Sequence, residues 1–141
     1  MRLFAALFFL MTRTVMKEKD MSEQSRYTDA TATVDDLKRL VDQFQRERNW
    51  AKYHTPKNLA SSVAIEAAEL MEHFQWLTPE ESYEVKNDPE KKEAIADEIA
   101  DVASYLLNLC LKLDVDLASE FARKMKKNAI KYPIPAREEA E

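Results

Sequence analysis

The stretch HTPKNLASSVAIEAAELMEHFQW, residues 54–76, determines the fold class of this chain. Thr55 can cap a helix that has Pro56 at its first position, a place where the missing N–H of proline is harmless. Apolar residues then recur every three or four positions, at Leu59, Val63, Ala67, Leu70 and Phe74. This period predicts an amphipathic helix that runs to about Trp76.

The same start signals recur along the chain and predict further helices. The residues that can cap a first turn are Thr33, Thr55, Thr78, Asp88 and Asp116. Glu81 can complete a capping box with Thr78. The helices expected are about residues 34–50, 56–76, 79–87, 89–113 and 117–131. We therefore expect an all-α fold, a four-helix bundle with a short extra helix.

Composition excludes several classes of nucleotide and nucleic-acid binder. The 141 residues include no Gly, so the phosphate-binding P-loop and the Gly-rich dinucleotide motif are both absent. The net charge of −5 argues against a nucleic acid polymer as partner, because such binding needs many cations against phosphates. The single cysteine, Cys110, cannot form an internal disulfide, and we expect it to be buried in a cytoplasmic protein.

The chain divides by pattern into three parts. Residues 1–32 form an N-terminal extension, in which residues 1–20 are interpreted as an upstream-start artefact or a disordered tail, since Met16 and Met21 are alternative starts. The apolar run of residues 3–11 is too short to span a membrane, so no membrane partner is expected. Residues 33–133 form the helical domain, and residues 134–141 a flexible tail.

Two helices carry acid pairs at a spacing of three: Glu66 with Glu69, and Glu98 with Asp101. This spacing puts both acids of a pair on one face, beside the apolar stripe of the helix. On the longest helix that stripe is Ile95, Ile99, Val102, Leu106 and Leu109. If the stripes pack together, the four carboxylates converge and need a cation, and oxygen-only ligands suit Mg²⁺.

Two other interpretations of the acid pairs stay open. A single Glu-x-x-Glu is usually a solvated face, as we expect for Glu72, Asp97 and Glu93. A di-iron carboxylate bundle also uses inward acids, but it normally needs Glu-x-x-His, and His73 is one residue out of register. Iron therefore ranks below magnesium.

Four segments together resemble the MazG-like nucleotide pyrophosphohydrolases, in particular the dCTP pyrophosphatase subgroup. They are FQRERNW (residues 44–50), the stretch 54–76 quoted above, EIADVASYLLNLC (98–110) and KMKKNAIKYP (124–133). The resemblance covers roughly residues 33–133. It implies that Glu66, Glu69, Glu98 and Asp101 bind magnesium, and that the chain assembles as a homodimer or homotetramer with sites between subunits.

The resemblance also implies a substrate pocket. Trp50 and Trp76 can stack on a base and His54 can hydrogen-bond its edge, although a helix-terminal Trp is more often part of the core. Tyr105 can line the site near the sugar or base. On the last helix the implied substrate contacts are Lys124 and Asn128. Lys131 and Tyr132 are weaker candidates, as is Lys57 near the start of the second helix.

The reaction expected is hydrolysis of a nucleoside triphosphate to a monophosphate and pyrophosphate. Magnesium would bridge the phosphates, while a carboxylate, for which Glu69 is the candidate, positions or deprotonates the attacking water. Because His54, Trp50 and Trp76 resemble the set found in the dCTP-preferring subgroup, the substrate expected is dCTP or a modified dCTP, and the biological purpose expected is cleansing of the nucleotide pool. A dUTP or broad-specificity pyrophosphatase, and a non-catalytic helical interaction protein, are the alternatives.

Overall fold

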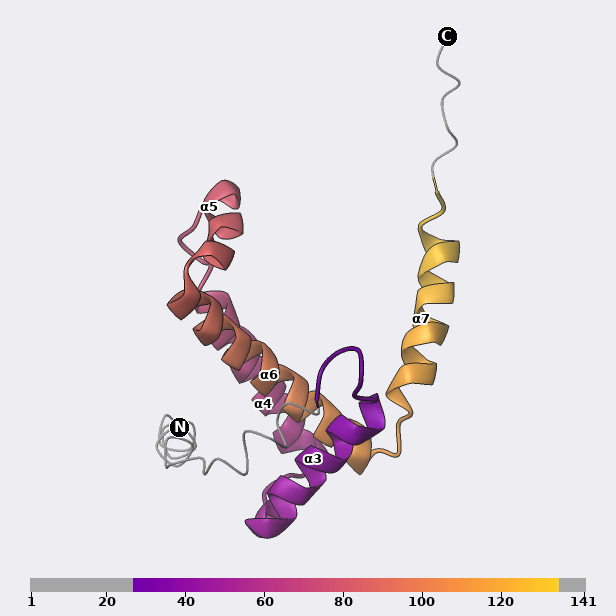
Figure 1. Ribbon diagram of the computed structural model, residues 1–141. Helices are drawn as coiled ribbons and strands as arrows, with labels where there is room; N and C mark the ends of the chain where they lie inside the picture. The colour runs from indigo at the N-terminus through magenta and orange to yellow at the C-terminus, as the bar shows by residue number, and fades with distance from the viewer. Residues whose placement is uncertain (1–26, 135–141) are drawn as a thin grey trace. The chain divides into compact units, whose positions relative to one another are not determined.

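The computed structural model describes residues 27–134, and all regular structure within that range is helical (Figure 1). The helices are α3 (Val34–Glu47), α4 (Pro56–Glu72), α5 (Pro79–Glu84), α6 (Pro89–Lys112) and α7 (Leu117–Lys131), with the 3-10 segments η1 (Trp50–Lys52) and η2 (Val85–Asn87). The all-α prediction, with four long helices and one short helix, is confirmed. Among the described helices none is long and apolar enough to cross a membrane.

The chain divides into two units between Thr33 and Val34, and all the described helices belong to the second unit. Of the first unit, residues 27–33 are described. They contain a turn in which the N–H of Ala32 donates to the carbonyl of Thr28, 2.9 Å away. The predicted disordered segment 1–20 lies outside the described residues, as does most of the predicted tail, residues 135–141.

Helix starts follow the predicted capping residues. Thr78 and Glu81 form the capping box: the Thr78 N–H donates to Glu81 Oε2 over 2.8 Å, and the Glu81 N–H to Thr78 Oγ1 over 3.2 Å. Thr55, Asp88 and Asp116 each accept a hydrogen bond from the N–H three residues on. These caps fix where α4, α5, α6 and α7 begin.

Two helix ends differ from the expected positions. The α3 helix ends at Glu47, before Trp50, because Asn49 adopts a left-handed conformation with φ 54°. The α4 helix ends at Glu72, before Trp76, and the N–H groups of Phe74 and Gln75 both turn back to the carbonyl of Met71. Neither end had a glycine or proline that would have marked it in the sequence.

Asp114 takes the place that glycine often fills at a helix C-terminus. It follows α6 with φ 53°, and the N–H of Val115 then donates to the carbonyl of Cys110 over 2.9 Å, as in a Schellman motif. The carbonyl of Val115 in turn accepts a hydrogen bond from Lys38 Nζ at 2.7 Å, which fixes the α6–α7 turn to α3. A short polar side chain thus substitutes for the absent glycine.

The core lies between α4 and α6, which run side by side in opposite directions because α5 connects their adjacent ends (Figure 1). The α3 helix packs against α6. Within the described part of the chain, the buried hydrophobic side chains are Leu59, Ile95 and Leu107. This contact positions the acidic pairs of α4 and α6 opposite each other.

The predicted apolar stripe of α6 is partly wrong. Ile99 is 53% exposed and Leu106 42% exposed, so the covered face of α6 is turned toward Ile95, Leu107 and Asn108. Ala67 of the α4 stripe is exposed as well. The reason is that α6 is apolar around much of its circumference, and one chain covers only part of it.

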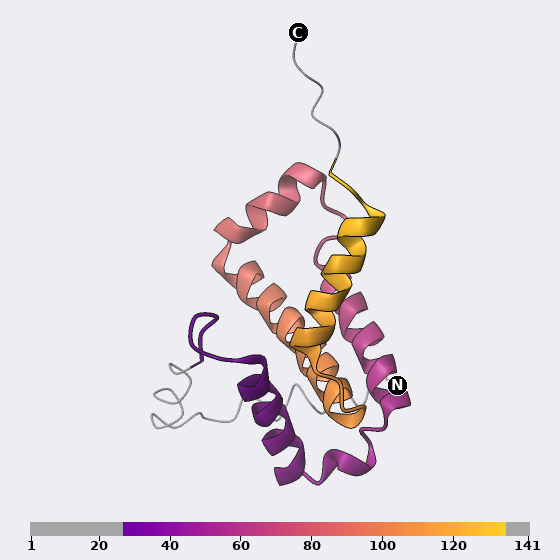
Figure 2. The same cartoon turned by 90° about the vertical axis from the view of Figure 1, so that its right-hand side faces the viewer.

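The α7 helix has no buried residue in this chain, and Phe121, Met125 and Ile130 are exposed along it. In Figure 1 and Figure 2, α7 follows the C-terminal end of α6 after a short connection. The four long helices expected are present, but α7 has an apolar surface that its own chain leaves uncovered.

Candidate metal centre

Three carboxylates from α4 and α6 meet at one point. Glu66, Glu69 and Glu98 each present an oxygen, and these three atoms lie within 4.8 Å of one another. Glu66 and Glu69 share a face of α4 because they are three residues apart, and the packing of α6 brings Glu98 to them. All three side chains are half-buried.

The electrostatics of Glu66 reflect this crowding. Burial, followed by the negative charges of Glu69, Asp101 and Glu98, raises the pKa of Glu66 to about 7. A carboxyl group with such a pKa holds a proton near neutral pH unless a cation replaces it. Asp101, the fourth predicted ligand, therefore acts on the same electrostatic site, although its oxygen lies outside the group of three.

Glu98 gives an independent sign that a cation fits here. Its Oε2 is buried and has no hydrogen-bond partner among the described residues. Burial, followed by repulsion from Glu69 and Asp101, raises the pKa of Glu98. Burial is also the largest cause of the raised pKa of Asp101. A buried carboxylate oxygen without a donor is costly, whereas it is an ordinary ligand for a hard divalent cation. The donor set therefore suits a divalent metal.

Tyr105 connects this acid cluster to the polar loop before α4. It lies one turn after Asp101 on α6 and shares a side-chain hydrogen bond with Ser62 of α4. Burial raises the pKa of the Tyr105 hydroxyl, and the charges of Glu66 and Asp101 raise it further. The phenol is therefore close to the acids and stays protonated.

An aromatic row of four rings, Tyr105, His54, Trp50 and Phe44, extends from the acid cluster. The ring centroids of Tyr105 and His54 are 6.3 Å apart, those of His54 and Trp50 are 5.9 Å apart, and those of Trp50 and Phe44 are 5.7 Å apart, all edge to face. Three of the predicted substrate residues, Trp50, His54 and Tyr105, are thus brought together beside the acid cluster.

The remaining predicted substrate residues are not brought to this site within one chain. Trp76 is 86% exposed and follows the C-terminus of α4, whereas His54 precedes its N-terminus, so a helix of 17 residues, about 25 Å long, separates them. Lys124, Asn128 and Lys131 lie on α7. Among the described residues, no side chain of α7 hydrogen-bonds to α4 or pairs with its acids, and Lys131 Nζ lies 5.0 Å from the Tyr132 ring centroid.

Two site residues, Gln45 and Asn108, were not predicted from the sequence. Each is 2% exposed, and each contacts Nδ1 of His54, from Gln45 Oε1 at 3.2 Å and from Asn108 Nδ2 at 2.9 Å. The sequence did hold one signal for Asn108, which is the only polar residue within the apolar run YLLNLC. Nothing marked Gln45 among the polar residues around it.

The chain is similar to known proteins in both sequence and fold. The sequence profile of the MazG-like family matches residues 61–141. The human dCTP pyrophosphatase 1 is 37% identical over 101 residues, which is 72% of this chain and 59% of that protein. The Bos taurus dCTP pyrophosphatase 1 is 35% identical over 102 residues, which is 72% of this chain and 60% of that protein.

Among solved structures, a pyrophosphatase from Archaeoglobus fulgidus DSM 4304 superposes with a TM-score of 0.66 at 44% sequence identity. The match covers 71% of this chain and 92% of that one. The chain matches about 60% of the length of the curated dCTP pyrophosphatases.

Proposed function

The chain belongs to the MazG-like family, and on that premise we propose that it is a magnesium-dependent nucleotide pyrophosphohydrolase. It converts a deoxynucleoside triphosphate, preferably dCTP or a modified dCTP, to the monophosphate and pyrophosphate. Family membership supports the reaction class, and the curated relatives, named dCTP pyrophosphatase 1, support the preference for cytosine.

The observation that carries this proposal is the carboxylate cluster of Glu66, Glu69 and Glu98, with the unpartnered buried Oε2 of Glu98. Four neighbouring acids are an unfavourable arrangement for a purely structural role, because each raises the cost of ionising the next. The arrangement becomes favourable when a divalent cation and the phosphates of a substrate are present together.

Glu66, Glu69 and Glu98 would hold Mg²⁺, with Asp101 beside them. A divalent cation held by these residues would supply positive charge against the phosphates of the substrate. Glu69 is the candidate base that positions or deprotonates the attacking water, and a Glu69→Gln variant that keeps both its activity and its metal binding would remove this role. Lys124 and Asn128, and Lys131 more weakly, would bind the phosphates of the leaving group.

The aromatic row provides the base side of the site. Trp50, His54 and Tyr105 extend from the acids in steps of about 6 Å between ring centroids. A triphosphate whose phosphates lie at the acids can therefore place its sugar near Tyr105 and its base near His54 and Trp50. Stacking and one edge hydrogen bond suit a pyrimidine.

A second copy of the chain would complete the site. The uncovered apolar residues Ile99, Leu106 and Phe121 give a large hydrophobic surface, and the fully buried core of a single chain is small. We propose a homodimer or homotetramer in which a partner covers this surface. The α7 cations, which no described contact joins to the acids of their own chain, and Trp76, which lies at the opposite end of α4 from His54, would then face the site of another subunit.

The test of this function is identification of the products formed from dCTP. With Mg²⁺, the expected products are dCMP and pyrophosphate, and chelation should stop their formation. Release of dCDP and inorganic phosphate would assign a different reaction. No hydrolysis in the presence of Mg²⁺, combined with a stable oligomer, would favour a non-catalytic interaction protein.

A further inference from the structure

His54 contacts two buried amides through a single ring nitrogen. Gln45 reaches Nδ1 from α3, Asn108 reaches it from α6, and His54 itself lies in the loop between η1 and α4. Buried amides at a single atom leave the imidazole little freedom to rotate, and their hydrogen-bonding capacity determines which ring nitrogen carries the proton.

The amide of Gln45 has one possible orientation. Its Nε2 donates to Asp42 Oδ1 over 3.3 Å, and Asp42 Oδ2 is ion-paired with Arg46 Nε at 2.7 Å. An ionised carboxylate only accepts hydrogen bonds, so the amide nitrogen must face Asp42 and the amide oxygen must face His54. Nδ1 therefore has an acceptor opposite it and needs to carry a hydrogen.

Asn108 agrees with this assignment after a half-turn of its amide. Its Oδ1 is buried without a hydrogen-bond partner among the residues described, while its Nδ2 points at the same Nδ1. The nitrogen and oxygen of an amide have nearly the same shape, so the half-turn costs no packing. It brings Oδ1 to the Nδ1–H and removes a contact between two donors.

We propose that Gln45 and Asn108 are positioning residues that hold His54 with its proton on Nδ1, so that Nε2 presents a lone pair to the base of the nucleotide. A hydrogen-bond acceptor at this point selects bases with an exocyclic amino group, such as cytosine or adenine, over uracil and thymine, which have a carbonyl there. The proposed base specificity rests on the proposed nucleotide hydrolysis, whereas the position of the His54 proton follows from the hydrogen bonds alone.

Two features of His54 support this role. Nε2 lies on a different edge of the ring from Nδ1, so it points away from the two amides, and the ring lies between Trp50 and Tyr105. Burial, followed by the positive charge of Lys112, lowers the pKa of His54. The imidazole is thus neutral near neutral pH and keeps its acceptor nitrogen.

The tautomer can be measured directly by NMR of protein labelled with ¹⁵N in its histidines. The chain has two histidines, His54 and His73. The ring signals that disappear in His54→Gln belong to His54, and those that remain belong to His73. The expected spectrum has a pyridine-type Nε2 and a protonated Nδ1 for His54. A protonated Nε2 with an unprotonated Nδ1 overturns the proposal.

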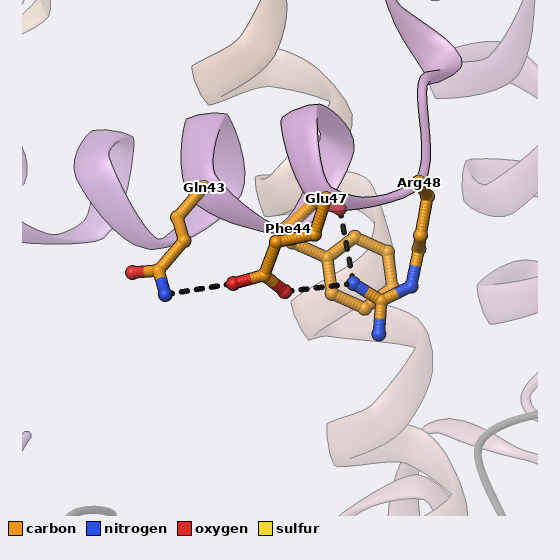
Figure 3. Close-up of polar contacts among 4 residues, drawn as sticks. All are labelled: Gln43, Phe44, Glu47 and Arg48. Carbon is orange, nitrogen blue, oxygen red and sulfur yellow. Dashed lines mark hydrogen bonds and ion pairs between the residues drawn. The ribbon is translucent and has the colours of Figure 1, made fainter.

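Gln45→Leu then tests the positioning role, because leucine has a similar size and cannot accept a hydrogen bond. We expect a mixed tautomer and a fall of about tenfold in the preference for dCTP over dUTP, mostly through KM for dCTP. The matched control is Gln43→Leu on the exposed face of α3, where Gln43 Nε2 donates to Glu47 Oε1 over 2.9 Å (Figure 3). Gln43→Leu should leave both the His54 tautomer and the preference for dCTP over dUTP unchanged.

Asn108→Asp retains an acceptor and should retain the Nδ1–H tautomer, which keeps the test valid if Gln45→Leu does not fold. An unchanged tautomer together with an unchanged dCTP/dUTP ratio in folded Gln45→Leu overturns the proposal. If the wild-type chain hydrolyses no nucleotide, the proposed function fails, while the NMR result still decides how His54 is held.

Discussion

A carboxylate oxygen of Glu66 on α4 lies within 4.8 Å of one of Glu98 on α6, and Glu98 Oε2 is buried without a hydrogen-bond partner among the described residues. Like charges at this distance oppose folding unless protons or a cation neutralise them. The metal-free chain thus gives up some stability at this point, as functional sites commonly do.

Metal and nucleotide together should stabilise the chain through these acids. Mg²⁺ with a non-hydrolysable dCTP analogue, at about 100 times its dissociation constant, should add about 2.7 kcal/mol and raise Tm by several degrees. The double variant Glu66→Gln/Asp101→Asn should lose this shift in differential scanning fluorimetry. An equal shift in the double variant would place the metal elsewhere.

The Tm of the metal-free chain should fall as pH rises toward 8. The pKa of Glu66 is raised to about 7, so its protonated form stabilises the fold. This contribution is fully present below the unfolded-state pKa, about 4.3, and is lost as pH rises through about 7. Thermal melts between about pH 5 and pH 8, with chelator present, measure the effect.

Glu66→Gln should flatten this pH profile, because glutamine does not titrate. Mg²⁺ binding should show the opposite dependence and strengthen as pH rises through about 7, since the cation displaces a proton. A wild-type profile that coincides with that of Glu66→Gln would show that Glu66 titrates normally.

Trp76 should become covered when chains associate. The chain has two tryptophans, so Trp50→Phe leaves Trp76, which is 86% exposed in one chain, as the only reporter. We expect blue-shifted emission at concentrations where sedimentation shows an oligomer, and a red shift on dilution. In the control Trp76→Phe, the emission of half-buried Trp50 should shift less on dilution. If Trp76 keeps the emission of a solvent-exposed tryptophan within the oligomer, it does not lie in the interface.

Local signals in the sequence were sufficient for the helices and for the acid pairs. Capping residues such as Thr78 and Asp88 act within one turn, so their effect can be inferred without knowing the fold. The spacing of Glu66 and Glu69 likewise fixes their common helical face. The meeting of these acids with Glu98 followed from the assumption that the two apolar stripes pack together.

Long-range packing set the features that the sequence did not reveal. Ile99 and Leu106 match the period of a core stripe, but their exposure depends on how much of α6 the other helices cover. Gln45 has polar neighbours like many surface residues, and it is buried only because α3 packs on α6 near His54. Trp50 precedes α4 and Trp76 follows it, so the length of this helix separates the two rings within one chain. The resemblance placed both in one pocket without regard to this separation.

The rate of pyrophosphate release with Mg²⁺ tests the central claim most directly. It is measured for the wild type, Glu66→Gln and Glu93→Gln, each with dCTP, 5-methyl-dCTP, dUTP, dATP and dGTP. Glu93 is an exposed acid on the same helix as Glu98 and serves as the matched control. We predict metal-dependent release led by the cytosine nucleotides, lost by about 100-fold in Glu66→Gln and unchanged in Glu93→Gln. Release that survives both chelation and Glu66→Gln, or no release by the wild type from any nucleotide, would contradict the account.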